Sequence, residues 1–409
     1  MNAGLAARNA RWLLWGHVVS MAGDAFSMVA IPLLVLEVTR QPAGIGIAMA
    51  CAAVPRVALV LQAGHMVDRL SARAVLIRAR YGHALVLSLL AMGAFLGRLG
   101  ALELYAASAV LGALSAFSYP AGSTVLPQLI GPERLRAVNT WLFSARHVCT
   151  LAGILTAGLL ISGIDAGAAG TSAGLCVALL TDAASFVLAA GLLAMTKEAR
   201  TDAGSSSAAA SPPSLRVFWT QWWQDRELRT VFVYFAVVSA LMGATTQVGL
   251  PMMARGLDSD SATALSHLLV CQCAGTLLGI VWFRSEHLES ALGWWLLAAD
   301  FVVGLLLIAL GMSSNLWMAG ACLAAIGFVS GALQQRSQRY LQQRLPQQTT
   351  GRLMSLLMFM IMVATPVCAM AAGELTAWYG VRSLFLGAGF SVLVFVMLVA
   401  GLTDLRRLA

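Results

Sequence analysis

Residues 64–76 read Gly64-His-Met-Val-Asp68-Arg69-Leu-Ser-Ala-Arg73-Ala-Val-Leu76. This charged stretch separates two apolar segments, near 43–66 and 74–97, and each is long enough for a bilayer span, which needs about 20 apolar residues. The glycine lets two helices approach closely, the acid can meet a helix N-terminus, and the arginines favour the cytoplasmic side of a membrane. The stretch therefore predicts a short cytoplasmic loop between two spans.

The composition extends this interpretation to the whole chain. Of its 409 residues, 59% are hydrophobic and 11% are charged, and the mean hydropathy is +0.80. A soluble domain carries roughly 25% charged residues, so the polar residues here are too few to cover a soluble globule. The same apolar content excludes a disordered chain. We therefore expect an all-α membrane protein that crosses the bilayer many times.

Apolar segments recur along the chain at the spacing of membrane spans. We expect twelve transmembrane helices in two six-helix halves, residues 1–196 and 229–409. The region between the halves, 197–228, is Ser/Ala-rich over 201–213, which predicts a flexible linker, and aromatic and charged over 216–226, which predicts a short interfacial helix. The expected spans lie near 12–37, 43–66, 74–97, 101–127, 138–162, 173–196, 229–252, 262–283, 289–311, 315–335, 353–373 and 380–403.

The basic residues predict the orientation of these spans. With the N-terminus inside, 20 of the 26 Lys and Arg residues fall in cytoplasmic segments, among them Arg78 and Arg80, while 4 fall outside and 2 lie within spans. Cytoplasmic loops carry an excess of Lys and Arg, so we expect both termini in the cytoplasm. Because the basic residues are spread along the chain, the net charge of +8 indicates membrane topology and not a nucleic-acid partner.

Five charged residues lie inside the expected spans. Each costs roughly 2.5–3.5 kcal/mol at a helix centre, so we expect them to face the protein interior or a water-filled cavity. Intramembrane charges often carry protons or contact cargo, although a buried pair can also be simple packing. Similar depths along adjacent helices would allow an Asp24–Arg56 pair. The candidates for proton coupling and cargo contact are Asp24, Arg56, Arg146, Asp182 and Asp300.

Patterns for catalysis or metal binding are lacking in this sequence. The seven cysteines lie inside apolar segments without zinc or disulfide spacing. A phosphate-binding G-x-x-x-x-G-K-[ST] loop is excluded, because Lys197 is the only lysine. An intramembrane aspartyl protease would need a G-x-G-D signature, and the chain has Met21-Ala-Gly-Asp24. We expect no enzyme activity, no metal and no cofactor, with a proton gradient as the energy source.

The loop at residues 64–76 resembles the loop 2–3 signature of the major facilitator superfamily, G-x-L-x-D-R-x-G-R-K-x-x-L. It matches at Gly64, Asp68, Arg69, Arg73 and Leu76, and differs at Ser71 and Ala72. More of the chain is similar to one branch, the third drug:proton antiporter family, which includes enterobactin and macrolide exporters. The similar stretches are 11–24, 117–127, 182–186 and 350–352. The span 5 antiporter motif G-P-x-x-G-G corresponds to Gly153-Ile-Leu-Thr-Ala-Gly158, which lacks the proline and one glycine.

This resemblance implies a transporter whose halves rock around a midplane cavity. It implies that the loop latches a cytoplasmic gate near the start of span 11, where residues 349–352 supply a helix start. The residues of this gate motif are Gly64, Asp68, Arg69, Arg73 and Arg352. It also implies a multi-pass protein of the cell (inner) membrane. We expect a monomer in the lipid bilayer that binds a small-molecule substrate.

The expected function is secondary active transport. We expect a proton-coupled exporter of an amphipathic small molecule, such as a drug or a secreted metabolite of the siderophore kind, and Arg56 and Arg146 favour an anionic cargo. One alternative is an importer or facilitator with the same fold. Another is a non-transporting membrane receptor or assembly factor, which would tolerate loss of the buried charges.

Overall fold

The structure is a computed structural model that describes residues 3–130, 132–167, 173–196, 226–258, 260–282, 292–344 and 347–402. Within these ranges some side chains lie outside the description, among them those of Gly64, Asp68, Arg69 and Arg352. All regular structure in the described ranges is helical, which confirms the expected all-α class. The interfacial helix expected at 216–226 lies outside the described residues, apart from Arg226 at the start of the next helix.

Six helices form an N-terminal group in which α1 packs against α5 and α6, and α2 packs against α4. They are α1 (Ala3–Thr39), α2 (Ala43–Arg69), α3 (Ala72–Phe95), α4 (Ala101–Ile130), α5 (Pro132–Gly167) and α6 (Ala173–Ala194). A C-terminal group is built around α10 against α12 and α11 against α13. It comprises α8 (Arg226–Ala244), the π-helix η1 (Thr245–Gly249), α9 (Leu250–Leu257), α10 (Ser261–Trp282), α11 (Leu292–Met312), α12 (Leu316–Arg344) and α13 (Gln347–Leu402).

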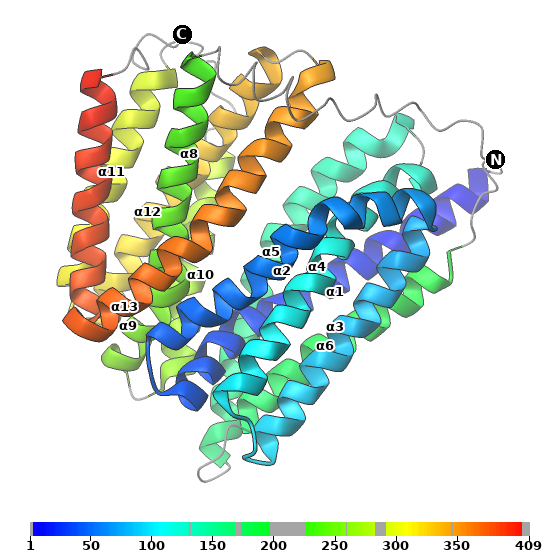
Figure 1. The fold of residues 1–409 in the computed structure, drawn as a ribbon, viewed down its shortest axis with the longest axis horizontal. Coiled ribbons are helices and arrows are strands. Elements are labelled where there is room, and N and C mark those ends of the chain that lie inside the picture. Colours follow the sequence, from blue (N-terminus) through cyan, green and yellow to red (C-terminus); the bar gives the residue numbers. More distant parts are fainter. Residues whose placement is uncertain are drawn as a thin grey trace.

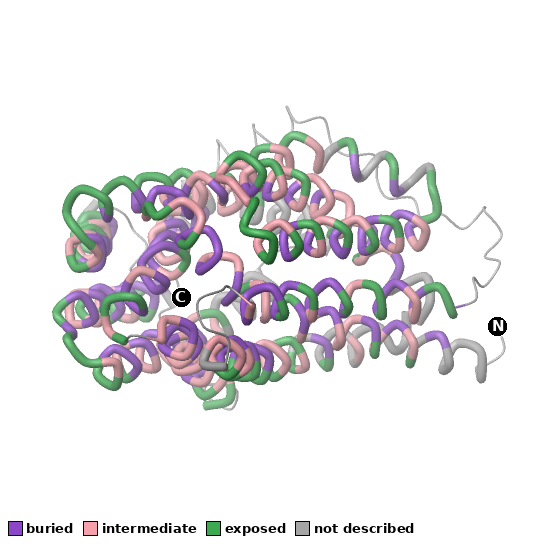
Figure 2. The backbone as a smooth tube through the Cα atoms, turned by 90° about the horizontal axis from the view of Figure 1, so that it is seen from below, coloured by how far each residue is buried: buried purple, intermediate pink, exposed green. Residues whose placement is uncertain are grey.

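Buried and exposed residues alternate along the helices (Figure 2), and many of the exposed residues are large and apolar. Phe95, Leu102 and Trp378 are each more than 70% exposed, which suits contact with lipid and not with water. Among the described residues, eleven helical segments are long and apolar enough to cross a membrane. The molecule is therefore a multi-pass helical membrane protein.

The last of these segments is twice as long as a single span. It runs over Phe359–Gly401, which would measure about 65 Å if straight, against a hydrocarbon thickness of about 30 Å. The helix is interrupted at Gly380, whose φ of 81° is a left-handed conformation that glycine adopts without strain. Before Gly380 α13 runs away from the end where both chain termini lie, and after it the chain returns toward that end (Figure 1).

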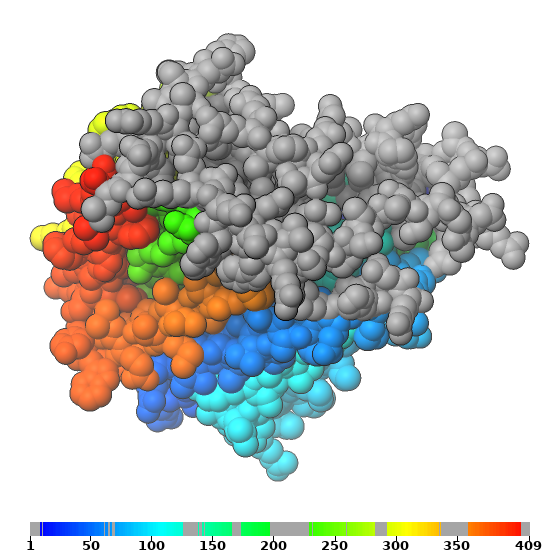
Figure 3. Space-filling view, turned by 45° about the horizontal axis from the view of Figure 1, so that its top comes forward, coloured from blue at the N-terminus to red at the C-terminus, as the bar shows by residue number. Residues whose placement is uncertain are grey.

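The two groups meet at the end of the molecule opposite the chain termini, and their helices diverge toward the other end (Figure 1). Here α2 lies directly against α13, as the blue and orange surfaces of Figure 3 show. A Cβ on Gly46 would lie 2.6 Å from the Ala369 carbonyl oxygen, and one on Gly373 would lie 2.9 Å from Ala43 Cα. The helices thus touch backbone to backbone, an approach that requires glycine at both positions.

A polar contact joins the two groups at the same end, between α5 and α10. Ser162 donates a hydrogen bond to the Asp260 carboxylate and lies 2.6 Å, oxygen to oxygen, from the Thr263 hydroxyl. Asp260 also caps α10, because one carboxylate oxygen accepts from the backbone N–H groups of Ala262 and Thr263, both at 3.2 Å. Arg255 adds a longer bond of 3.4 Å to the Leu36 carbonyl oxygen.

We predict that Gly46→Val weakens the contact between α2 and α13. The added atoms would overlap backbone, which does not move aside as a flexible side chain would, so we expect a cost of about 1–3 kcal/mol. Spin-label distances across this end should lengthen. The matched control is Gly163→Val on α5, where an added Cβ meets nothing within 4 Å. An unchanged distance distribution in the Gly46 variant would contradict this account of the contact.

We also predict that the Ser162–Asp260 contact weakens only in strong acid. Burial raises the pKa of Asp260, but the hydrogen bonds from Ser162, Thr263 and Ala262 outweigh burial and leave the pKa below its ordinary value of about 3.9. The stabilisation is therefore complete above that value and is lost as the pH falls through the lowered one. Spin-label distances between α5 and α10 should be constant from pH 8 to pH 5, and Ser162→Ala should lengthen them throughout this range.

Candidate functional site

Asp24 occupies the middle of the membrane-spanning part of α1. It lies 13 residues, or about 20 Å, from the start of a 29-residue span, Arg11–Thr39, and its side chain is exposed. The basic side chains whose charges act on it are Arg146 of α5, which is also exposed, and Arg80 of α3. A carboxylate flanked by charges from two other helices faces the bundle and not lipid, and its exposure at this depth favours contact with water.

Asp182 of α6 lies next to this group but is sealed from solvent at 1% exposure. The hydroxyl of Ser27, from α1, donates a hydrogen bond to one carboxylate oxygen, and Ser185 lies 3.3 Å from the other. The Asp24 charge acts on Asp182, so the two carboxylates form one cluster across α1 and α6. Gly23 permits this approach, because a Cβ there would overlap the Ser185 side chain.

Arg80 of α3 is an interior residue. The charge count assigned it to the cytoplasmic side, but it lies about 12 Å into α3 and is only 5% exposed. Its Nη1 donates a 2.8 Å hydrogen bond to the Ala189 carbonyl oxygen of α6. Gly16 of α1 lies beside this contact, because an added Cβ there would lie 3.3 Å from the Ala189 carbonyl oxygen and 3.6 Å from Arg80 Nη1. Arg80 therefore belongs to the interior cluster with Asp24.

Arg56 of α2 approaches a different group, centred on His83 of α3. The His83 ring stacks on Phe186 with centroids 5.0 Å apart, and its nitrogens lie 2.8 Å from the Ala79 carbonyl oxygen and 3.3 Å from the Ser115 hydroxyl. Arg56 is partly buried and its Nε is buried without a hydrogen-bond partner. Similar depth allowed an Asp24–Arg56 pair, and the charge of Arg56 acts on His83 in the structure.

Asp300 of α11 is buried in the C-terminal group at 3% exposure. Tyr234 of α8 donates a hydrogen bond to its carboxylate, and the tyrosine ring stacks on Phe395 of α13 with centroids 5.6 Å apart. This contact joins three helices and involves no basic residue in the contacts described. Asp300 and Asp24 are both single acids within apolar segments of the sequence. In the structure Asp300 is buried and accepts a hydrogen bond from a tyrosine, whereas Asp24 is exposed between arginines.

Of the gate-motif residues, the structure describes the side chain of Arg73. Its Nε donates to the Leu193 carbonyl oxygen and the Thr196 hydroxyl, both at 3.1 Å, and its Nη2 donates to the Ala194 carbonyl oxygen at 2.7 Å. Arg73 thus satisfies the free carbonyls at the C-terminus of α6, where a cation is favoured. The side chains of Gly64, Asp68, Arg69 and Arg352 lie outside the described part, so their gate role stays a prediction.

The glycines of the expected antiporter motif in α5 have a packing role. A Cβ on Gly153 would lie 2.6 Å from the Ala25 Cβ of α1, and one on Gly158 would overlap Ser266 of α10. Gly153 therefore sets the approach of α5 to the helix that carries Asp24. Gly158 sets the approach of α5 to the C-terminal group.

The fold agrees with a family match in the sequence. A family model described as the Major Facilitator Superfamily matches residues 13–285, about two thirds of the chain. The chain belongs to the Major Facilitator Superfamily. This confirms the family expected from the loop motif, and the protein is therefore a membrane transporter by family. A comparison with curated protein sequences finds no significant match.

Solved structures share the fold of this protein over nearly its whole length. The nucleoside transporter NupG is 12% identical, with a TM-score of 0.73, covering 98% of this chain and 99% of its own. A bacterial homolog of the human lysosomal transporter Spinster, inward-facing and unoccupied, is 11% identical, with a TM-score of 0.75 and coverage of 100% and 97%. A bacterial homologue of the iron transporter ferroportin, inward-facing, is 18% identical, with a TM-score of 0.68 and coverage of 96% and 98%. At such identities the likeness shows the fold alone.

We predict that two arginines only two residues apart on α3 contribute very differently to stability. Arg80→Ala removes a buried cation and leaves Asp24 and the Ala189 carbonyl without it, which should cost about 3–5 kcal/mol of stability. Arg78→Ala changes an exposed residue and should stay within about 0.5 kcal/mol. Thermal unfolding of the purified variants in detergent measures both. Equal melting temperatures for the two variants would contradict the interior position of Arg80.

Proposed function

We propose that this protein is a proton-coupled exporter of amphipathic small molecules, of the drug:proton antiporter kind that its sequence resembles. The observation that carries the proposal is the exposed Asp24 carboxylate at mid-membrane, flanked by the charges of Arg80 and Arg146. An intramembrane carboxylate that is open to water can gain and lose a proton. Each gain or loss of a proton at Asp24 would weaken or restore its attraction to the neighbouring arginines. This change would couple the proton gradient to the movement of the two helix groups.

The three intramembrane aspartates receive different roles in this proposal. Asp24 exchanges the proton, because it is the exposed one. Asp182 shares the cluster and responds to the charge of Asp24, while its hydrogen bond from Ser27 joins α1 to α6. Asp300 holds α11 to α8 through Tyr234. This division gives each of the three aspartates a role that offsets its cost of insertion.

We propose that the cargo is anionic or has an anionic end. Arg146 is exposed beside Asp24, and Arg56 has a buried Nε without a hydrogen-bond partner. An arginine offers five donors in a planar fork that suits carboxylate or phosphate groups. A cargo anion could pair with Arg146 or with Arg56 through such a fork.

The proposed topology has twelve spans with both termini in the cytoplasm of a cell (inner) membrane, as a monomer. Counting α13 as two helices that reverse at Gly380 adds one span to the eleven apolar segments. An even number places both chain ends on one face, and the excess of Lys and Arg assigns that face to the cytoplasm. The contacts between the groups at the opposite end then correspond to a state closed toward the outside.

Transport by Asp24→Asn is the test of this proposal. In everted vesicles with an imposed pH gradient, the unmodified protein should move anionic amphipathic dyes against their concentration gradient. The variant cannot release a proton at this position, so its dye movement should fall to the level seen without a gradient, while passive exchange continues. Glu103→Gln, which changes an exposed carboxylate in the first turn of α4, is the matched control and should transport normally.

Other results would select the alternatives. Gradient-driven movement in the opposite direction would identify an importer, and equilibration that ignores the pH gradient would identify a facilitator. Full gradient-driven efflux by Asp24→Asn would disprove the role of that carboxylate. Two results together would favour a receptor. One is the absence of any dye movement in a panel of anionic and cationic compounds, and the other is normal function of cells that express a variant without the five intramembrane charges.

A further inference from the structure

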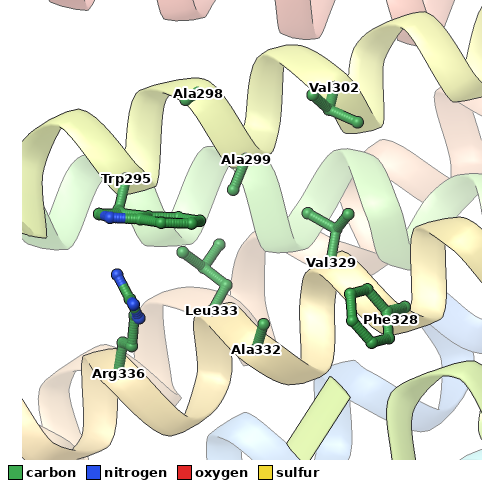
Figure 4. Close-up of a pocket in the computed structure, with 9 residues that line it drawn as sticks. All are labelled: Trp295, Ala298, Ala299, Val302, Phe328, Val329, Ala332, Leu333 and Arg336. Atoms are coloured by element: carbon green, nitrogen blue, oxygen red, sulfur yellow. The ribbon is translucent and has the colours of Figure 1, made fainter. Parts of the chain in front are cut away.

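An apolar groove of about 170 Å³ lies between α11 and α12, away from the charged cluster. Its walls are carbon-rich: Ala299 and Val302 line one side from α11, and Val329 and Ala332 line the other from α12. Trp295 and Arg336 lie together at one end of the groove (Figure 4). The groove therefore combines an apolar channel with a single cationic end.

The groove runs along the helices and not across them. From Trp295 to Val302 it follows α11 for about 10 Å, and from Arg336 to Phe328 it follows α12 for about 12 Å. The two helices run in opposite directions, so Arg336 faces Trp295 at one end, and Phe328 and Val302 lie at the other (Figure 4). This length and narrow apolar lining suit an extended alkyl chain.

The groove opens on the outer face of the C-terminal group. Trp295 is 38% exposed and Val302 is 43% exposed, whereas Leu296 and Val303, on the opposite face of α11, are buried. The adjoining Trp294 is also exposed. In a membrane this outer face meets lipid, so the groove is accessible to lipid chains.

The cationic end lies at the level of the lipid headgroups. Trp295 is the third residue of the apolar span Gly293–Met312, and Arg336 comes two residues after the span Leu316–Gln334. The Arg336 guanidinium lies over the Trp295 ring, 4.1 Å from its centroid, which is a cation–π contact. Tryptophan and arginine are favoured at this depth, where an apolar body meets a polar headgroup layer.

We propose that this groove binds an anionic phospholipid of the leaflet at the face that carries the chain ends. The lipid phosphate pairs with Arg336, which the Trp295 ring holds at the mouth, and one acyl chain lies along Ala299, Val302 and Val329. A basic residue between membrane helices at the cytoplasmic side attracts anionic headgroups, with about 1 kcal/mol for each basic residue. The site is separate from Asp24, so the inference does not depend on the transport mechanism.

Native mass spectrometry of the full-length protein tests this site, with phosphatidylglycerol and phosphatidylcholine of identical chains as probes. We expect the unmodified protein to retain one phosphatidylglycerol in preference to phosphatidylcholine by about fivefold, the factor that corresponds to one basic contact. Arg336→Gln should remove the preference, because the headgroup contact is lost. Ala299→Leu should reduce retention of both lipids, because Ala299 points into the groove (Figure 4).

Two control variants keep the test specific. Arg78→Gln removes an exposed arginine from α3, and Ala184→Leu enlarges an exposed alanine of α6, so neither should change lipid retention. Arg336→Lys keeps the charge and should keep part of the preference, which distinguishes loss of the headgroup contact from misfolding. Equal retention of the two lipids by the unmodified protein would overturn the proposal. So would an unchanged preference in Arg336→Gln, or the same loss in Arg78→Gln.

Discussion

The hydrocarbon core of a bilayer does not solvate charge, and the interior of this protein is organised by that constraint. Each intramembrane ion must find a partner in the protein or contact water, since otherwise insertion costs several kcal/mol. Arg80 meets a carbonyl oxygen of α6, Asp182 meets two serines, and Asp300 meets a tyrosine. Asp24 is the exposed acid of this set, so the same constraint that joins helices also singles out one carboxylate.

The N-terminal and C-terminal groups solve this constraint differently. The N-terminal group assembles charges of both signs from α1, α3, α5 and α6, and these charges act on one another. In the C-terminal group the described acid is enclosed by Tyr234 and Phe395, which suits a fixed structural role. The contact surface between the groups is made mainly by α2 with α13, where glycines let the backbones touch, and by α5 with α10, where Ser162 bonds to the Asp260 carboxylate. The described cluster of opposite charges therefore lies in one helix group, although the two groups have a similar outline.

Apolar length was enough to place most helices, but not to orient their faces. The expected spans near 43–66 and 173–196 agree with α2 and α6 within a few residues, because the number of apolar residues that crosses a bilayer is nearly constant. Arg78 and Arg80 were assigned together to the cytoplasm, yet they point about 160° apart around α3, and only Arg80 is buried. The Tyr234–Asp300 contact joins residues 66 positions apart, so no local pattern could reveal it. The burial of Arg80 next to Gly16 depends on helix packing, which a single sequence does not encode in any short motif.

The seam between α2 and α13 is formed by main chain, and this limits how it can change. Gly46 and Gly373 have no side-chain heavy atoms, so every substitution at either position adds volume where backbone is already in contact. Mutation can therefore act there in one direction only, toward separation of the helices. A lineage that needed a tighter or looser seam would have to alter the surrounding positions on the opposing helices, and the two glycines would remain as the fixed point around which the others vary.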